Sequence, residues 1–381
     1  MKRPFALIGI TYLSVQAALF YFQQIYIAAV VAVVCFVGAV VSLFTLKNKS
    51  IRHTALGFCI TAAFASVIFG GYSALVRQPI TEKYSDKDIY VTATVIEQPT
   101  RKYDYYKYLI ETEQINKKSE RLRINLSTIS EINVEEFDRI SCVLSVKECE
   151  QNSMIADGAF LQASADKNFA YIVKASDNKP LYYNAIKLRK SFANSLNNLM
   201  SNDSASLCRA VLLGEKSALS QDVQNDFTRC GVSFLIVVSG MHLAIICSFV
   251  FFCIKGIIRS RALRSLIMIL CAFAFMAVSG FSPSVVRAGI MLAVVYSGKM
   301  FMRNGDSLNS LGIAALILTV PNPVAVADVG MLLSFMATLG IILWAQGMTA
   351  FIMGKFTKLN RLKRPIEFIV NLFSVSVSAA V

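Results

Sequence analysis

The sequence predicts a polytopic α-helical membrane protein with a small β-barrel inserted between its apolar helices. Of the 381 residues, 55% are hydrophobic and only 16% are charged. Many of the apolar runs are long enough to cross a hydrocarbon layer about 30 Å thick, which indicates a protein with several spans. One stretch of about 100 residues has instead the alternating polar and apolar pattern that is typical of short strands.

Three apolar runs open the chain, at roughly 4–22, 25–46 and 53–75. Basic residues flank them at Lys2, Arg3, Lys47, Lys49 and Arg52. Because short loops rich in Lys and Arg stay in the cytoplasm, we expect both basic positions on that side of the membrane. Three spans then form an N-terminal unit over 1–78 and deliver the chain to the outer face.

The second unit, 79–180, is predicted to be an extracytoplasmic β domain. Segments such as IYVTATVIEQ, RLRINLST and DRISCVLSVKE indicate about five short strands and favour a small barrel. Between Thr81 and Pro180 there are 14 Lys/Arg and 17 Asp/Glu, although the whole chain has a net charge of +14. The positive charge therefore lies mostly in loops between apolar runs, where it orients spans and does not by itself indicate nucleic acid.

Four tyrosines of this domain form a candidate base-stacking platform with Lys102 and Lys107: Tyr103, Tyr105, Tyr106 and Tyr108. The alternative is that tyrosines alternate here because strands favour aromatic residues. The net negative charge of the domain favours this alternative, since such a domain attracts phosphate weakly.

Residues 181–230 are predicted to be helical and to lie at the outer face. Leu188, Phe192 and Leu196 share one helical face while Lys187 and Lys190 lie elsewhere, a pattern typical of a helix on a membrane surface. Further apolar runs predict a second transmembrane unit over 231–381, near 233–254, 264–280, 284–302, 307–320, 328–347 and from 366 onward. Because the sequence stops within the last run, we expect the native protein to be longer.

Cysteine positions give one disulfide candidate. Cys208 and Cys230 both fall outside the cytoplasm in this topology, where the environment is oxidising. Cys142 and Cys149 are not expected to pair, because seven residues of strand separate them by about 23 Å.

A polar cluster interrupts the apolar run from Val232 to Phe252, which has the length of one span. Ser239, Gly240 and His242 lie near the middle of that run. One interpretation is structural, with Gly240 allowing close helix packing and His242 bonding to a neighbouring span. The other is that the cluster faces the bundle interior or a polar path.

Four motifs give the chain a resemblance to a known family. They are V-L-L-G-E-x-S-x-L at 211–219, L-x-x-x-S-G-M-H-L at 235–243, S-P-S-V-V-R-A-G-I-M at 282–291 and N-P-V-A-V-A-D-V-G-M-L-L-S-F at 322–335. Together they resemble the competence domain of the ComEC family, the DNA-internalisation channels of naturally transformable bacteria. Phe234 stands where a histidine is common in that family, and Met331 with Leu332 where Phe-Gln is usual.

The resemblance implies a channel subunit for single-stranded DNA in the bacterial cytoplasmic membrane. It also implies that the β domain is like an oligonucleotide/oligosaccharide-binding (OB) barrel, and that the chain works with a DNA receptor and a cytoplasmic helicase motor. Six residues of the motifs become candidates for a polar network or pore lining: Ser239, Gly240, His242, Arg287, Asp328 and Ser334. For Arg287 and Asp328 the alternative is snorkelling to the outer interface.

We expect no catalytic residues, metal or cofactor in this chain. Many family members end in a metallo-β-lactamase-like domain, but the two histidines here, His53 and His242, do not make a histidine-rich metal site. No glycine-rich G-x-x-x-x-G-K-S/T loop is present to bind nucleotide. Two other functions stay open: a small-solute transporter, for which internal repeats are expected, and a membrane-anchored sensor whose barrel binds an extracellular ligand.

Overall fold

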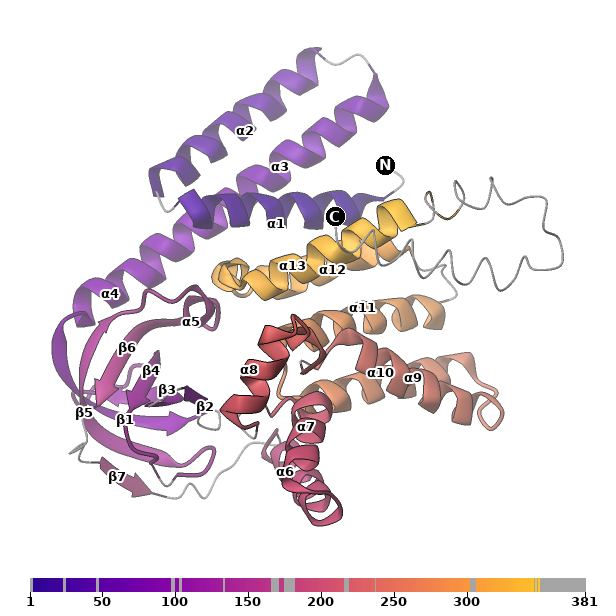
Figure 1. Cartoon of the computed structure of the whole chain (residues 1–381). Coiled ribbons are helices and arrows are strands. Elements are labelled where there is room, and N and C mark those ends of the chain that lie inside the picture. Colours follow the sequence, from indigo (N-terminus) through magenta and orange to yellow (C-terminus); the bar gives the residue numbers. More distant parts are fainter. Residues whose placement is uncertain are drawn as a thin grey trace.

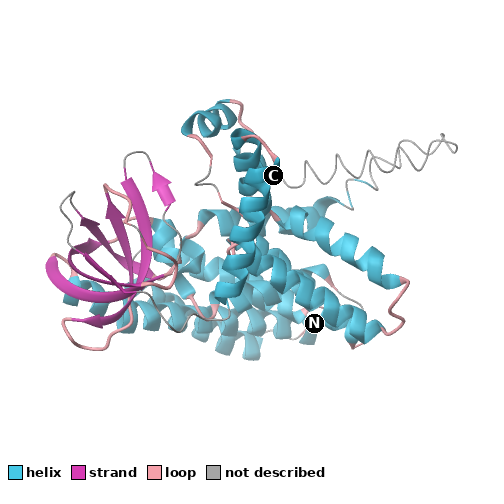
Figure 2. Ribbon diagram, turned by 90° about the horizontal axis from the view of Figure 1, so that it is seen from below, coloured by secondary structure: helices cyan, strands magenta, loops and turns pink. Residues whose placement is uncertain are grey.

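The computed structural model shows a bundle of helices with one β domain at its end (Figures 1 and 2). It describes residues 3–22, 25–45, 48–96, 100–102, 105–132, 134–165, 171–174, 182–215, 219–236, 238–301, 306–345, 347 and 349. Three described helices are long and apolar enough to cross a membrane: Pro4–Phe22, Ile51–Tyr84 and Arg261–Val278. Four shorter apolar helices accompany them, at Ile27–Ser42, Gly240–Lys255, Ser307–Thr319 and Val329–Ala345.

The three apolar runs that open the chain are helices, as predicted: α1 (Pro4–Phe22), α2 (Ile25–Thr45) and α3 (Lys49–Tyr72). Helix α3 continues through one π-helical turn, η1 (Ser73–Arg77), into α4 (Gln78–Tyr84), and so reaches the β domain without a loop (Figure 1). The boundary expected near residue 78 therefore falls inside a helix, and the β domain begins at Lys87.

The outward faces of α2 and α3 are strongly apolar. Large side chains at least half exposed include Val33, Val34, Phe36 and Val37 of α2, and Phe58, Ile60 and Phe64 of α3. A contiguous apolar surface of this kind is costly in water but suits a hydrocarbon layer, because helices satisfy their own backbone hydrogen bonds. These two helices therefore have the surface of membrane spans.

The β domain is a closed five-stranded barrel, as the alternating segments predicted. Its strands are β1 (Lys87–Val95), β3 (Tyr105–Ile115), β4 (Arg123–Thr128), β5 (Arg139–Glu148) and β6 (Ala159–Ala165). They pair in the order β1-β3-β4-β6-β5, and β1 closes the ring on β5. The β4–β6 pair is parallel and the others are antiparallel.

Two short strands extend the barrel, β2 (Thr100–Lys102) against β3 and β7 (Tyr171–Lys174) against β5. The alternating side chains of the five main strands fill the interior, including Ile89, Val91, Ile110, Ile124, Leu126, Ile140 and Leu161. A short helix, α5 (Asn152–Ala156), connects β5 to β6. The barrel thus has its own core and meets the bundle through α4 and α5.

The segment between barrel and second bundle half is helical, as expected, with α6 (Tyr182–Leu199), α7 (Asn202–Leu213) and α8 (Gln221–Arg229). On α6, Lys190 Nζ lies 2.7 Å from Glu136 Oε2 of the barrel, a carboxylate that is almost fully buried. The next residue, Arg189, pairs with Glu215 beyond α7 at 3.1 Å. Helix α6 therefore ties the barrel to the bundle.

The C-terminal half contains η3 (Ser233–Ile236), α9 (Gly240–Lys255), α10 (Arg261–Val278), α11 (Pro283–Met300), α12 (Ser307–Thr319), η4 (Pro323–Ala327), α13 (Val329–Gly340) and η5 (Ile341–Ala345). These helices match the predicted apolar runs, with two differences. The 3₁₀ helix η3 replaces the start of the span expected at 233–254, and the 3₁₀ helix η4 comes just before α13. The run expected from residue 366 lies outside the described residues.

Helix α1 packs against α12, far along the chain. At the crossing, a Cβ on Gly9 or on Gly312 would overlap the backbone of the other helix. Asn309 Oδ1 accepts a hydrogen bond from the backbone N of Ala6 at 3.1 Å. The N-terminal helices and the C-terminal half, which the sequence suggested as separate units, therefore share one packed bundle (Figure 1).

Candidate functional site

Three of the sequence motifs meet where α7, α9 and α11 have their ends. Gly214 closes α7 with φ +78°, a left-handed conformation that favours glycine. A Cβ at that position would lie 3.2 Å from the backbone O of Ser279 and 3.4 Å from Val238 Cγ2. The 211–219, 235–243 and 282–291 motifs are thus brought to one place, with Val238, Met276 and Val285 packed between them.

Ser239 and His242 begin helix α9, which corrects the expectation of an unbroken span. The run from Val232 to Phe252 is divided into η3 and α9, and His242 lies in the first turn of α9. The Ser239 backbone N–H donates to His242 Nδ1 at 3.2 Å, and Ser239 Oγ lies 3.1 Å from the same nitrogen. His242 therefore takes the place of the Glu or Gln of a capping box.

The sequence signal for this break was the spacing S-G-M-H, a helix-capping residue followed three positions later by a hydrogen-bond acceptor. The apolar residues on both sides concealed it. Gly240 has the packing role that one interpretation gave it, since a Cβ there would lie 2.8 Å from Ala288 Cβ of α11.

Arg287, in the second turn of α11, places a positive charge inside the bundle. Only 9% of the residue is exposed, and its Nε and Nη1 groups have no hydrogen-bond partner among the described residues. The guanidinium carbon lies 5.6 Å from the ring centroid of Phe335 on α13, a cation–π distance. A buried guanidinium with N–H groups still unpaired is costly, and an anion beside it would relieve that cost.

The two candidates on helix α13 are Asp328, at its start, and Ser334. Asp328 is the N-cap of α13, and its Oδ1 accepts from the backbone N of Gly330 at 2.8 Å. No ion pair between described residues joins Asp328 to Arg287. Ser334 is half-buried on α13, next to Phe335. Among the described residues the structure thus has two helix caps and a separate buried arginine. A shared polar network or pore lining for these residues stays a prediction.

Sequence reasoning missed the role of Glu215, although it lies in the first motif. Its carboxylate is buried and pairs with two arginines, Arg189 Nε at 3.1 Å and Arg209 Nη2 at 2.8 Å. Gly280, with φ +70°, lies against the first of them, since a Cβ there would come within 2.9 Å of Arg189 Nη1. The Glu215 ion triad thus joins α6, α7 and the α10–α11 turn that leads to Arg287.

Tyr108 cannot belong to the predicted tyrosine platform. Tyr108 is 1% exposed in the barrel core, and its hydroxyl accepts a hydrogen bond from the backbone N of Ile132 at 2.7 Å. Tyr106 packs partly buried against that core, and Tyr105 is half-buried. Tyr103 lies outside the described residues. Tyr108 therefore serves the fold, because the inward register of β3 places its ring in the core.

All nine cysteines are free in the structure, including Cys208 and Cys230, so the disulfide proposed from topology is not formed. Cys142 and Cys149 are unbridged, as expected from their positions in and just after β5. Burial raises the pKa of the Cys142 thiol to about 12. Among the described residues, no group of three or more His, Cys, Asp or Glu side chains could hold a metal ion.

Comparison with known proteins gives two matches, and both are to competence proteins. A family model described as "Competence protein" matches residues 211–381, which include all four motifs. The "ComE operon protein 3" of Bacillus subtilis (strain 168) is 24% identical over 302 residues, which are 77% of this chain. The chain spans 38% of the length of that relative. No solved structure matches.

Proposed function

We propose, because the chain belongs to the ComEC family of competence proteins, that it forms part of a channel carrying single-stranded DNA across the bacterial cytoplasmic membrane. Membership of this family goes with a role in DNA uptake during competence. The finer assignment, a path for one strand through the helices, is ours. A strand of phosphates cannot enter hydrocarbon, so a polar path must be enclosed by protein.

The observation that carries this proposal is the buried guanidinium of Arg287. Ionisable residues inside a membrane bundle are rare and mark ion or substrate paths. A phosphodiester supplies the negative charge that the described protein does not place at Nε and Nη1 of this side chain. Phe335, whose ring the guanidinium faces, offers an aromatic surface on which a base can stack.

Two helices begin next to each other in this part of the bundle, and one of them, α11, carries Arg287. Helices α9 and α11 begin side by side, with Val238 packed on Val285 and Gly240 close to Ala288. The first N–H groups of a helix carry partial positive charge and favour anions. Ser239 and His242 then act as positioning residues, which hold the start of α9 against α11.

We also propose that the barrel is of the OB type and lies at the outer face of the membrane. Its five strands, closed through β1 and β5 with one parallel pair, support a barrel of the OB type. The basic loops at the other ends of α1 and α3 support its placement outside the cytoplasm. We assign the chain a transport role without catalysis, and we expect the driving force and the incoming DNA to come from other competence proteins.

The experiment replaces Arg287 in the full-length gene and measures transformation frequency. Arg287→Gln should lower it by about tenfold or more, because a charge-assisted contact contributes about 1.5–3 kcal/mol. Arg287→Met should do the same while the purified protein unfolds at an equal or higher temperature, since a buried charge has been removed. The exposed Arg261 provides the matched control, and Arg261→Gln should behave like the parent.

Normal transformation in Arg287→Gln, at the parent's protein level in the membrane, would contradict the proposal. A sensor whose spans only anchor the barrel would give that result. A small-solute transporter would instead lose growth-linked uptake of its solute in the Arg287 variants while cells continued to take up DNA.

A further inference from the structure

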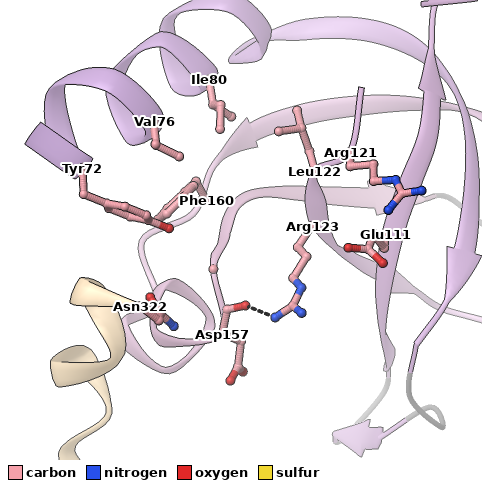
Figure 3. A pocket seen from close by; sticks show the side chains of 11 residues that line it. Tyr72, Val76, Ile80, Glu111, Arg121, Leu122, Arg123, Asp157, Phe160 and Asn322 are labelled. Carbon is pink, nitrogen blue, oxygen red and sulfur yellow. Dashed lines mark hydrogen bonds between the residues drawn. The ribbon is translucent and has the colours of Figure 1, made fainter. Parts of the chain in front are cut away.

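A cavity of about 280 Å³ lies where the barrel meets the long α3–η1–α4 helix (Figure 3). One wall is apolar and comes from that helix, through Tyr72, Val76 and Ile80 on successive turns. Phe160 of β6 continues the wall, with its ring centroid 6.2 Å from that of Tyr72. The cavity is separate from the Arg287 site, and none of the residues discussed there lines it.

The position of this wall corresponds to the boundary between hydrocarbon and water. Counted from Ile51, where the apolar helix begins, about 20 residues cross the hydrocarbon, so the crossing ends next to Tyr72. Tyrosine is enriched at that boundary. Val76 and Ile80 then lie roughly 6 and 12 Å further along the helix, at the depth of lipid headgroups.

The opposite wall supplies cationic donors. Arg121 and Arg123 are two positions apart at the start of β4, and both exposed side chains line the cavity, together with the carboxylates of Glu111 and Asp157 (Figure 3). Arg123 Nη1 donates to the backbone O of Asp157 at 2.7 Å, which fixes its guanidinium. The two guanidinium groups can donate to a phosphodiester, which accepts several N–H bonds at once. Because Glu111 and Asp157 also line the cavity, its formal charge is balanced, which favours a headgroup that carries both a negative and a positive charge.

Asn322 forms the floor of the cavity and has a side-chain oxygen that can accept a hydrogen bond. Asn322 Nδ2 donates to the backbone O of Ala156 at 2.6 Å, which sets the orientation of the amide. Its Oδ1 is buried and has no hydrogen-bond partner within the part of the chain that the structure describes. A buried acceptor of this kind requires an explanation, and a ligand N–H at this position provides one.

We infer that this cavity binds the headgroup of a phospholipid that carries a primary amine. The phosphate accepts from Arg121 and Arg123, the ammonium donates to Asn322 Oδ1, and the glycerol end lies against Val76 and Ile80. One nucleotide of a DNA strand shares the phosphodiester and an amino group, but it has no apolar tail for the helical wall. The inference is independent of the proposed DNA path.

The test uses the purified full chain in detergent. Phosphatidylethanolamine, phosphatidylglycerol or phosphatidylcholine is added, and bound lipid is measured by native mass spectrometry. Phosphatidylethanolamine should bind about tenfold more tightly than phosphatidylglycerol, which has no amine for Asn322. Arg121→Gln should weaken phosphatidylethanolamine binding about tenfold. Lys147→Gln, which removes an exposed charge elsewhere on the barrel, should leave it unchanged.

A second variant tests the cavity without changing charge. Val76→Trp fills the space from the helical wall and should abolish selective binding, while the unfolding temperature without added lipid shows that the barrel is intact. Equal binding of the three lipids, or unchanged binding by Arg121→Gln, would overturn the inference. Displacement of phosphatidylethanolamine by a short deoxyadenosine oligonucleotide would also overturn it, because it would assign the cavity to nucleic acid.

Discussion

At the scale of single residues, the roles of His242 and Arg287 differ although both are polar residues of the motif segments. His242 Nδ1 accepts from the backbone of Ser239, so its ring is committed to the start of α9. Arg287 is 9% exposed, and its Nε and Nη1 groups have no hydrogen-bond partner among the described side chains and backbone. The first arrangement stabilises the fold, and the second provides the charge that the proposed function assigns to contact with DNA.

Replacement of His242 distinguishes these roles. His242→Gln keeps an acceptor at the third position of the helix, as a standard capping box does, so DNA uptake should stay near that of the parent. His242→Leu removes the acceptor and should lower the free energy of unfolding by about 1 kcal/mol. Thermal unfolding and transformation frequency measured on both variants check this. A well-folded glutamine variant without uptake would show that the imidazole itself contacts the strand.

The residue-scale features were only partly predictable from the sequence. Motif residues were identifiable as candidates, and the packing role of Gly240 was among the interpretations. The partners were not predictable, because they depend on which helices cross and at what distance. Glu215 shows this, since its arginines at 189 and 209 are on two different helices and no local pattern joins them.

At the scale of secondary-structure elements, the apolar runs and the strand alternation predicted most helices and the barrel. The broken elements were not predicted, since a 3₁₀ turn followed by a shorter helix, as in η3–α9 and η4–α13, has the same apolar composition as one continuous span. The register of Tyr108 was missed for a similar reason, because alternation fixes two faces without stating which is inside.

The Glu215 ion triad holds α6 and α7 to the α10–α11 turn, and Glu215→Gln tests this. The substitution leaves two partly buried arginines without a countercharge, so the free energy of unfolding should fall by about 3 kcal/mol. Glu113→Gln is the control, because its pair with Arg139 is exposed and contributes about 0–1 kcal/mol. Chemical unfolding in detergent measures both. Equal effects of the two substitutions would mean that the triad does not fix these helices.

At the scale of the whole molecule, contacts between distant parts of the sequence join three regions into one body. Helix α1 crosses α12 at Gly9 and Gly312, and α6 connects the barrel to the second half of the bundle. The N-terminal spans are therefore part of the wall around the C-terminal helices. In the channel that we propose, both halves of the chain therefore contribute helices.

Gly312→Ala tests this joint. The added Cβ would overlap the backbone of α1 at Phe5, so destabilisation should reach or exceed the about 1–3 kcal/mol of ordinary overpacking. Gly71→Ala is the matched control, since nothing lies within 4 Å of a Cβ there and alanine favours a helix. The unfolding temperatures of the two variants are compared, and we expect a clear decrease for Gly312→Ala only. If Gly312→Ala is as stable as the parent, α1 does not pack on α12 in this way.

The central claim, that single-stranded DNA passes beside Arg287, is tested most directly by cross-linking during uptake. A photoreactive phenylalanine analogue replaces Phe335, whose ring faces the guanidinium, and labelled DNA is supplied to competent cells. The control places the analogue at Phe36, which is 66% exposed on the apolar face of α2. We predict label on the protein with the analogue at 335 and none with it at 36. Active uptake without a cross-link at 335, or with equal label at both positions, would contradict the claim.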